Sequence, residues 1–291
     1  MTDAANNRAI RNISDTARWV AVYRAMETER PDAIFRDPYA RRLAGERGEQ
    51  IVNALRGGRR QSWSMIVRTA LIDEILLRII ASEPVDVVMN LAAGLDTRPH
   101  RLALPAGLKW IEVDLPEMID YKKQVLANET PHCQLEQVAM DLADVAARRA
   151  LLARVNASAQ RIFVITEGLL AYLEEQQAAA LAEDLHQADH VQYWLTDLAS
   201  PKVRQMMEKH WGKHLQAAGA PIKFAPEAAE EFFRPYGWEA AEFHDFFQAS
   251  RKLDRTMPNA WIMVMMMRLM PRRSERMMKQ WRSGVVLLRR I

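Results

Sequence analysis

Short apolar runs alternate with longer helical patterns from residue 85 onward, and this alternation constrains the fold more than any other feature of the chain. The run at 85–91 is rich in β-branched residues and lies between Pro84 and Gly94, as expected of a strand buried on both faces. Similar runs occupy 109–114, 136–140, 161–166 and 191–196, with helical patterns at 117–128, 143–155 and 174–188 between them. Strands and helices that alternate in this way form βαβ crossovers and a parallel sheet with helices on both faces.

The segments that flank this alternating region are mostly helical. A helix is predicted over 61–82, and further helices at 203–218 and 226–234. Two more strands are predicted at 238–243 and 284–288. We therefore expect a helical N-terminal cap over 1–60, which ends at the hinge Gly57-Gly58, and one main domain over 61–291 with a helical insertion at 257–283.

Composition excludes several classes of protein. The chain is 49% hydrophobic and 26% charged, a balance typical of folded proteins, and it lacks a run of about 20 apolar residues that could cross a bilayer. No secretory signal pattern follows Met1, so we expect a cytoplasmic protein without membrane association. A single cysteine, Cys133, excludes an intrachain disulfide and argues against a bound metal. A net charge of +3 gives no reason to expect nucleic-acid binding.

A turn of small residues follows the first predicted strand, where open α/β sheets hold their ligands. It reads Ala92-Ala93-Gly94 and lacks the third glycine of a dinucleotide fingerprint, which counts against NAD and FAD and hence against a dehydrogenase. Asp114 lies 20 residues after Gly94, at a strand end where an acidic residue accepts ribose hydroxyls. Glu112 shares its strand face but lies further from that end, so we prefer Asp114. S-adenosylmethionine has a ribose but no phosphate and fits this pattern.

Several short motifs occur in a fixed order along the chain. They are TARWVA at 16–21, FRDPYA at 35–40, NLAAGLDTRP at 90–99, EVDLP at 112–116, MDL at 140–142 and TEGLLAYL at 166–173. Together they resemble the bacterial branch of the leucine carboxyl methyltransferase family over about residues 14–245. The resemblance implies a Rossmann-like class I methyltransferase fold with a mostly parallel sheet and an antiparallel last strand. It also implies S-adenosylmethionine as cofactor.

The resemblance assigns cofactor roles to individual positions. The implied cofactor-binding residues are Arg18, Arg68, Gly94, Asp114, Asp141, Leu142 and Glu167. The methionine part of the cofactor would lie near Gly94 and Arg68, and the ribose on Asp114. The family's common Gly-Ala-Gly or Gly-Cys-Gly turn reads Ala-Ala-Gly here, so the chain departs from the family pattern at the first small residue, Ala92.

The remaining implied residues surround the same cofactor. Asp141 and Leu142 would lie beside the adenine, Glu167 close to the amino group, and Arg18 over the site. Each acidic position also has a structural interpretation. Asp141 could cap the helix predicted from residue 143, and Glu167 could cap the helical segment that follows it.

Arg68 has support that does not depend on the resemblance. It lies on the same helix face as Ile72, Ile75 and Ile79, where an unpaired charge would be costly. We therefore expect an anion to meet it, on the supposition that no protein partner is sufficient to hold the charge. The alternative is that Arg68 reaches solvent or pairs with a carboxylate such as Asp96.

The methyl acceptor is expected to be a small molecule with a carboxylate. A carboxylate is ionised at pH 7 and needs only orientation, and Tyr172 and Arg98 are the candidate residues to hold it. A hydroxyl acceptor would instead need a general base such as His100 or His244. A non-catalytic module that binds the cofactor is a third possibility.

The C-terminal region is rich in methionine and basic residues. Met263, Met265, Met266, Met267 and Met270 are interpreted as core filler rather than a binding surface. The basic residues between 268 and 290 are interpreted as a solvated face, with an anionic surface as the alternative. We also predict that 1–60 and 257–283 close over the cofactor as a lid, and that the insertion leaves room for a homodimer contact.

Overall fold

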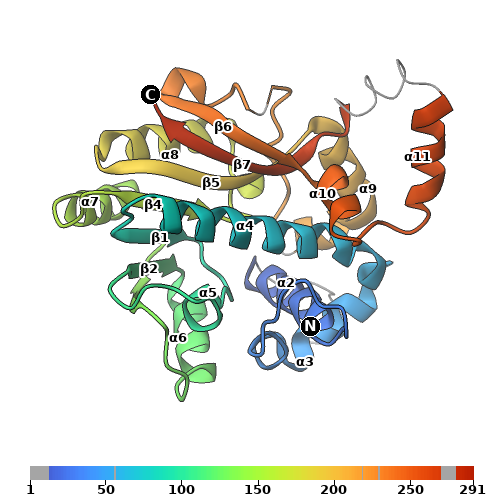
Figure 1. Ribbon diagram of the computed structural model, residues 1–291, viewed down its shortest axis with the longest axis horizontal. Helices are drawn as coiled ribbons and strands as arrows, with labels where there is room; N and C mark the ends of the chain where they lie inside the picture. The colour runs from blue at the N-terminus through green and yellow to red at the C-terminus, as the bar shows by residue number, and fades with distance from the viewer. Residues whose placement is uncertain (1–12, 56, 218, 229, 270–279) are drawn as a thin grey trace.

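The computed structural model describes residues 13–55, 57–217, 219–228, 230–269 and 280–291, which form an α/β sheet with helices on both faces (Figure 1). Within these residues the sheet has seven strands in the order β3-β2-β1-β4-β5-β7-β6. The strands are β1 (Val87–Leu91), β2 (Lys109–Asp114), β3 (Gln134–Ala139), β4 (Ile162–Thr166), β5 (Val191–Ala199), β6 (Trp238–Asp245) and β7 (Ser283–Arg290). The first five run parallel, and β7 is antiparallel to both of its neighbours. The predicted fold is confirmed.

The chain changes direction across the sheet between β1 and β4. It passes outward from β1 through β2 to β3, and then returns to place β4 on the other side of β1. In open parallel sheets such a reversal leaves a crevice beyond the carboxyl ends of the two strands, because their connecting segments diverge there. The topology therefore puts the ends of β1 and β4 at the base of the ligand crevice.

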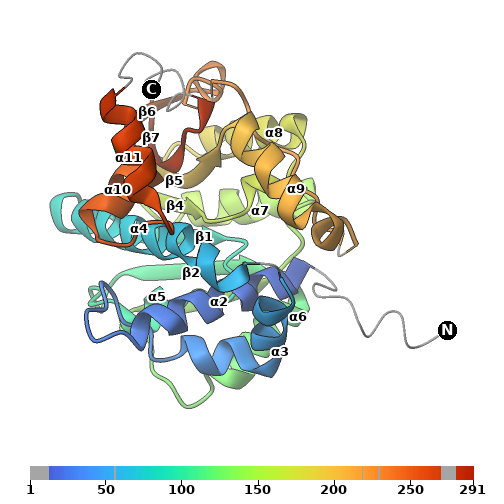
Figure 2. The same ribbon diagram turned by 90° about the vertical axis from the view of Figure 1, so that its right-hand side faces the viewer.

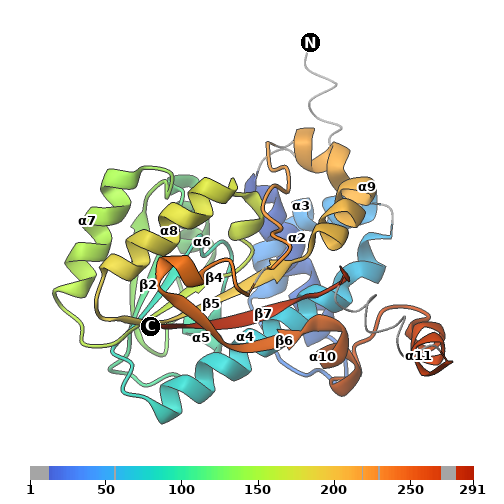
Figure 3. The ribbon, with the colours of Figure 1, turned by 90° about the horizontal axis from the view of Figure 1, so that it is seen from above.

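Helices cover both faces because the central strands are apolar on both sides. Every residue of β1 and of β4 is buried. On one face α4 (Ser62–Ser82) and α10 (Phe246–Lys252) pack against the sheet, and on the other α7 (Val145–Asn156) and α8 (Glu175–Gln187) do so (Figure 3). The stripe predicted for α4 is confirmed, since Ile72, Ile75 and Ile79 are all buried.

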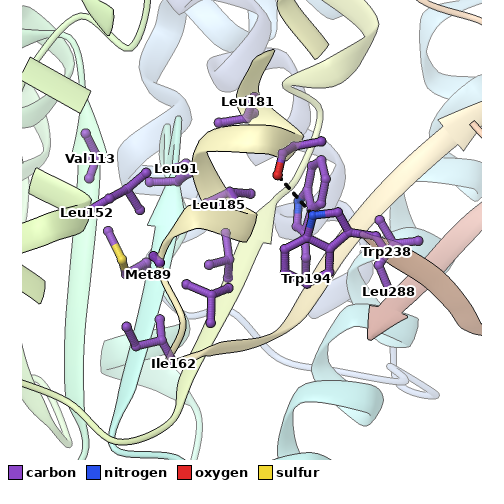
Figure 4. Packing of buried hydrophobic residues seen from close by; sticks show 14 of the residues in the cluster. Met89, Leu91, Val113, Leu152, Ile162, Leu181, Leu185, Trp194, Trp238 and Leu288 are labelled. Carbon is purple, nitrogen blue, oxygen red and sulfur yellow. Dashed lines mark hydrogen bonds between the residues drawn. The ribbon is translucent and has the colours of Figure 1, made fainter. Parts of the chain in front are cut away.

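Two tryptophans occupy the core where the sheet turns antiparallel. The rings of Trp194 on β5 and Trp238 on β6 are 5.8 Å apart, beside aliphatic side chains from β1, β4 and α8 (Figure 4). Both indole nitrogens are satisfied: Trp194 donates to the Thr166 hydroxyl at 2.8 Å, and Trp238 to the Ala182 carbonyl at 3.0 Å. Large rings with satisfied N–H groups can therefore fill this side of the core without leaving a buried polar atom unpaired.

The N-terminal helices α2 (Ile13–Thr28) and α3 (Ala40–Ala54) lie together next to α6 (Pro116–Val125) (Figure 2). They share an apolar cluster with α9 (Pro201–Ala217), in which the rings of Trp19 and Trp211 are 5.1 Å apart. A buried ion pair of 2.9 Å between Glu27 and Arg255 also joins α2 to the segment after α10. Packing and charge thus hold the N-terminal helices against segments that are distant in sequence.

Short helical elements complete the described chain. They are η1 (Gly58–Gln61), α5 (Arg98–Arg101), η2 (Leu170–Tyr172), η3 (Arg234–Tyr236) and α11 (Ala260–Leu269). The helix predicted at 226–234 is wrong, because the described residues there form turns that end in η3. No helix of the described residues combines the length and apolarity that a bilayer crossing requires.

The interpretation of the methionines as core is wrong for Met265, the one whose side chain can be assessed. Its side chain on α11 is 50% exposed, and its neighbour Trp261 is 66% exposed. Figures 1 and 3 show α11 standing apart from the sheet, which explains this exposure. The side chains of Met263, Met266 and Met267 and the whole of Met270 lie outside what the structure describes.

The ion pair between Lys122 on α6 and Glu112 on β2 predicts a sharp effect on stability. Their atoms lie 2.7 Å apart and both side chains are fully buried. Lys122→Met should lower the free energy of unfolding by about 3–5 kcal/mol, because Glu112 is left as an unpaired buried charge. Burial already raises the pKa of Glu112, so a variant lacking the ammonium should recover stability as the pH falls and the carboxyl takes up a proton.

Urea denaturation of the wild-type protein and of Lys122→Met at two pH values measures the loss of stability. Lys109→Met is the matched control. Lys109 pairs with Glu136 at 2.9 Å, but both side chains are about one-third exposed, so its loss should cost less than about 1 kcal/mol. Equal losses in the two variants would contradict a structural role for the buried pair.

Candidate functional site

A large cavity opens at the carboxyl edge of the parallel strands. Its volume is about 1120 Å³, somewhat above the range of roughly 300–1,000 Å³ usual for small-molecule sites. The floor comes from the segments that follow β1, β2, β3, β4 and β5, and the walls from α2, α4, α9 and the start of α10. Such a cavity has room for a cofactor and a second small molecule side by side.

The turn after β1 is tied to the end of β2 by Asp114. One carboxylate oxygen of Asp114 accepts the Gly94 N–H at 2.6 Å, and the other accepts the Leu115 N–H at 2.8 Å. Ala92 has a φ of 56°, in the left-handed region that favours glycine. The family glycine that this chain replaces with alanine therefore falls at a position whose backbone conformation suits glycine.

The structure separates the two acidic candidates on β2. Asp114 lines the cavity, and burial raises its pKa despite the two backbone N–H groups that it accepts. Glu112 is fully buried and accepts from Lys122 and, at 2.9 Å, from the Gln137 side chain. Asp114 is thus the acidic group of β2 that a ligand can reach, in agreement with the preference from sequence.

Arg68 faces the cavity but already has two carboxylate partners. Its Nε donates to Glu167 at 3.0 Å and its Nη1 to Asp197 at 3.1 Å. The supposition that no protein partner is sufficient to hold this charge is therefore wrong. The alternative, that Arg68 pairs with a protein carboxylate, is confirmed, but the partners are Glu167 and Asp197 rather than Asp96. No hydrogen bond occupies Nη2 within the described part of the chain, so that nitrogen can still donate to a ligand anion.

Glu167 lies between two arginines at the end of β4. One oxygen accepts from Arg68 and the other from Arg98 Nη1 at 2.8 Å. These guanidinium groups lower the pKa of Glu167, although burial opposes them. Glu167 lines the cavity, so its ionised carboxylate can meet a cationic group of a ligand.

Arg98 lies behind Glu167 as seen from the cavity. It is therefore not placed to hold the acceptor, which is the role predicted from the sequence. It is 1% exposed, it does not line the cavity, and its guanidinium binds Asp73 at 2.7 Å and Asp96 at 2.8 Å as well as Glu167. A buried side chain outside the cavity lining cannot contact an acceptor there, so Arg98 positions Glu167.

Asp197 is a member of the site that the sequence interpretation missed. It lies on β5, lines the cavity, and accepts both the Gly168 N–H at 2.6 Å and Arg68 Nη1. The sequence offered one signal for this residue, because Asp197 directly follows the run predicted as the fifth strand. That strand, β5, lies beside β4, so its carboxyl end reaches the same edge of the sheet.

Arg18 points away from the cavity, against the role implied by the resemblance. Its guanidinium lies 3.8 Å from the centre of the Tyr121 ring and donates to the Leu43 carbonyl at 3.5 Å. The basic residue of α2 that lines the cavity is Arg24, which pairs with Asp37 at 2.8 Å. The resemblance therefore selected an arginine of this helix that does not line the cavity.

The remaining predicted residues lie along the cavity. Asp141 and Leu142 line it after β3, and Asp141 accepts the Ala143 N–H at 2.9 Å, while Asp144 caps α7. Tyr172 in η2 also lines it, and burial raises the pKa of its phenol. The structure thus brings six of the seven implied cofactor residues and Tyr172 to one cavity, and it leaves Arg18 outside.

The two histidines proposed as general bases lie elsewhere. His100 is buried in α5 and does not line the cavity, and burial lowers its pKa to about 4. His244 on β6 contacts Glu242 at 2.8 Å and is also outside the lining. No histidine is found among the described residues that line the cavity.

Comparison with known proteins agrees with this geometry. Residues 17–186, more than half of the chain, match the family described as leucine carboxyl methyltransferase. The chain belongs to the leucine carboxyl methyltransferase family. It is therefore a methyltransferase, and the family predicted from the motifs is confirmed.

Relatives of this methyltransferase occur in actinobacteria. A Frankia alni protein with the provisional name S-adenosyl-L-methionine-dependent methyltransferase is 37% identical over 63% of this chain and 67% of its own length. A Streptomyces coelicolor protein with the same provisional name is 38% identical over 57% of this chain and 62% of its own. The matches thus span about two thirds of these relatives. Their names agree with the cofactor prediction.

One solved structure has the same overall fold. A DUF574 family protein from Streptomyces avermitilis superimposes with a TM-score of 0.59 at 11% identity, over 93% of this chain and 97% of its own. At this identity the likeness concerns the arrangement of the sheet and helices alone.

The cavity residues of this methyltransferase fit the parts of S-adenosylmethionine. The free Nη2 of Arg68 suits the cofactor's carboxylate, and Glu167 suits its ammonium. Asp114 retains acceptor capacity for ribose hydroxyls, since each of its oxygens accepts one backbone N–H. Among the described residues no group of three or more His, Cys, Asp or Glu side chains is arranged to hold a metal ion.

Gly168 provides a test of the site's geometry. Its φ is 69°, and a Cβ there would lie 3.4 Å from Arg68 Nη1. Gly168→Ala should destabilise the protein by about 1–2 kcal/mol through backbone strain, and a shift of this strained turn, which contacts Arg68, should also weaken binding of S-adenosylhomocysteine. Gly57→Ala is the control, because Gly57 has a φ of 72° with open space around it. Thermal denaturation and calorimetry should show similar destabilisation but weaker binding only in Gly168→Ala; equal binding would refute the proposed place of Arg68 in the site.

Proposed function

We propose that this protein is an S-adenosylmethionine-dependent O-methyltransferase that methylates a carboxylate of a small molecule. The family and the cavity residues support the cofactor. The observation that carries the choice of a carboxylate is Arg60, which lines the cavity and whose side chain has no ion pair or hydrogen bond among the described residues. An unpaired guanidinium beside a cavity suits an anionic acceptor.

The other cations that line the cavity are already paired. Arg24 binds Asp37, Arg148 binds Asp184, and Lys223 binds Glu174 at 3.0 Å, whereas Arg68 belongs to the cofactor end. Arg60 is therefore the cation that can meet an acceptor carboxylate without breaking an ion pair between described residues. It lies in η1, directly before α4 and eight residues before Arg68, and both side chains line the cavity.

In this reaction the main tasks of the protein are to bind the cofactor and the acceptor and to orient them. When bound, S-adenosylmethionine supplies an electrophilic methyl group on its sulfonium. Glu167, Asp197 and Arg68 hold the amino-acid end of the cofactor, and Arg60 and Tyr172 orient the acceptor. Apolar side chains such as Trp63, Met207 and Phe246 line the remainder and exclude water, which strengthens the polar contacts.

An acceptor hydroxyl is the alternative, and the pH dependence of the reaction separates the two. A carboxylate is ionised above about pH 5, so the rate with a carboxylic acid should stay constant from about pH 6 to 9. A phenol that lacks a general base should react faster as the pH rises toward its pKa of about 10. The described lining contains no histidine to flatten that profile.

Incubation with isotope-labelled S-adenosylmethionine and matched panels of apolar carboxylic acids and phenols tests the proposal, with products read by mass. Methyl esters from the acids, formed at a constant rate over this pH range, are the expected result. Phenyl ethers alone would contradict the carboxylate assignment. Cofactor binding without any product from either panel would favour a non-catalytic binding module.

Arg60→Gln should raise the KM for a carboxylate acceptor by roughly tenfold to a hundredfold, the range for one lost charged hydrogen bond, with little change in S-adenosylhomocysteine binding. Arg59→Gln is the matched control, because Arg59 is the adjacent residue, pairs with Glu49 at 2.8 Å and does not line the cavity. Steady-state kinetics and calorimetry measure the two effects. If Arg59→Gln and Arg60→Gln raise KM equally, the acceptor contact does not exist.

A further inference from the structure

One continuous network of ion pairs extends from the cavity into the protein behind it. Its members come from α4, α5, β5 and the segments after β1 and β4, and they alternate in charge. They are Asp197, Arg68, Glu167, Arg98, Asp96, Asp73 and Arg101. Four carboxylates face three guanidinium groups, so the network carries one negative charge in excess.

The links of this network are short and continuous. Arg68 joins Asp197 at 3.1 Å to Glu167 at 3.0 Å, and Arg98 joins Glu167 at 2.8 Å to the two aspartates behind it. Arg101 closes the far end with a contact of 2.7 Å to Asp73. Because neighbouring members lie within hydrogen-bonding distance of one another, a change of charge at the far end changes the electrostatic potential at the cavity end.

No neighbouring pair compensates the excess charge. Arg24 with Asp37, and Lys122 with Glu112, lie next to the network, and each of these pairs is neutral in sum. Nearby arginines keep the pKa of Asp96 and of Glu167 below their ordinary values, so both are ionised at neutral pH. The network's members are mostly buried, so solvent and salt screen its field weakly.

We propose that this excess negative charge makes the site discriminate between cationic and neutral adenosyl ligands. S-adenosylmethionine carries a sulfonium, an ammonium and a carboxylate, and so has a net charge of +1, whereas S-adenosylhomocysteine lacks the sulfonium and is neutral. The network therefore holds the methyl donor more tightly than the demethylated product, which is released after transfer. This inference rests on the proposed cofactor.

Asp73 and Arg101 are the positioning residues through which the charge can be changed. Neither lines the cavity, so neither touches the ligand. Their side chains pair with each other, with Arg101 Nη1 2.7 Å from an Asp73 oxygen and Nη2 2.8 Å from the other. Asp73→Asn leaves a neutral network, Arg101→Gln leaves an excess of two negative charges, and the double variant restores an excess of one.

The experiment compares two stable ligands by calorimetry. Sinefungin has a carbon bearing an ammonium in place of the sulfonium and is a cation of similar shape, whereas S-adenosylhomocysteine is neutral. The wild-type protein should bind sinefungin more tightly. A unit charge on the order of 10 Å away, at an effective dielectric constant of about 20, changes an affinity by roughly tenfold.

The ratio of the two affinities should move in opposite directions in the single variants. Asp73→Asn should reduce the preference for sinefungin by up to about tenfold, and Arg101→Gln should increase it by a similar factor. Asp73→Asn/Arg101→Gln is the control and should return to the wild-type ratio. Circular dichroism establishes that each variant is folded.

Each outcome decides the inference. An unchanged ratio in folded single variants overturns it. So does a wild-type protein that binds S-adenosylhomocysteine as tightly as sinefungin, a result that needs no variant to fold. Failure of the wild-type protein to bind either adenosyl compound would instead contradict the cofactor, so the two kinds of failure are distinguishable.

Discussion

The carboxylate of Glu167 is the contact on which the site depends. It accepts from Arg68 on α4 with one oxygen and from Arg98 on α5 with the other, so it joins the end of β4 to two helical elements. Removing a partner from such a buried arrangement leaves a charge without compensation, at a cost of several kcal/mol. The segments after β1 and β4, between which the cofactor is proposed to bind, are thereby held at a fixed separation.

The same geometry explains why the N-terminal helix α2 belongs to the site. The sheet ends in a crevice because its strand order reverses beside β1, and α2 and η1 supply one wall of that crevice. Glu27 and Arg255 fix α2 to the segment after α10, and Met257 and Pro258 beyond that segment also line the cavity. We propose that α2, η1 and residues 257–258 together enclose the acceptor, a cover that would protect the sulfonium from water.

The sequence predicted the sheet well because its signals are local. A strand buried on both faces is rich in apolar and often β-branched residues, and the positions predicted for β1, β2, β4 and β5 agree with the structure within about three residues. Ordered motifs then predicted the family, and six of the seven residues that they implied for the cofactor lie along one cavity. The helix expected at 226–234 was wrong because this apolar and acidic stretch suits a helix locally, whereas tertiary contacts keep it in turns.

Side-chain partners could not be predicted in the same way. Arg68 meets Asp197, which lies 129 residues later in the chain, and no local pattern reports a contact of that range. Arg98 was assigned to the acceptor because its carboxylate partners could not be recognised: they come from three different segments of the chain. Arg18 and Arg24 lie on the same helix, and only the packing of α2 decides which of them faces the cavity.

A crystal structure of the protein with S-adenosylhomocysteine tests the central claim most directly. The account predicts the ribose hydroxyls on Asp114, the ammonium beside Glu167 and the carboxylate on the free nitrogen of Arg68, with the ion pairs of Glu167 intact. An adenosyl ligand bound elsewhere, or a Glu167 released from Arg98 when the ligand binds, would contradict it.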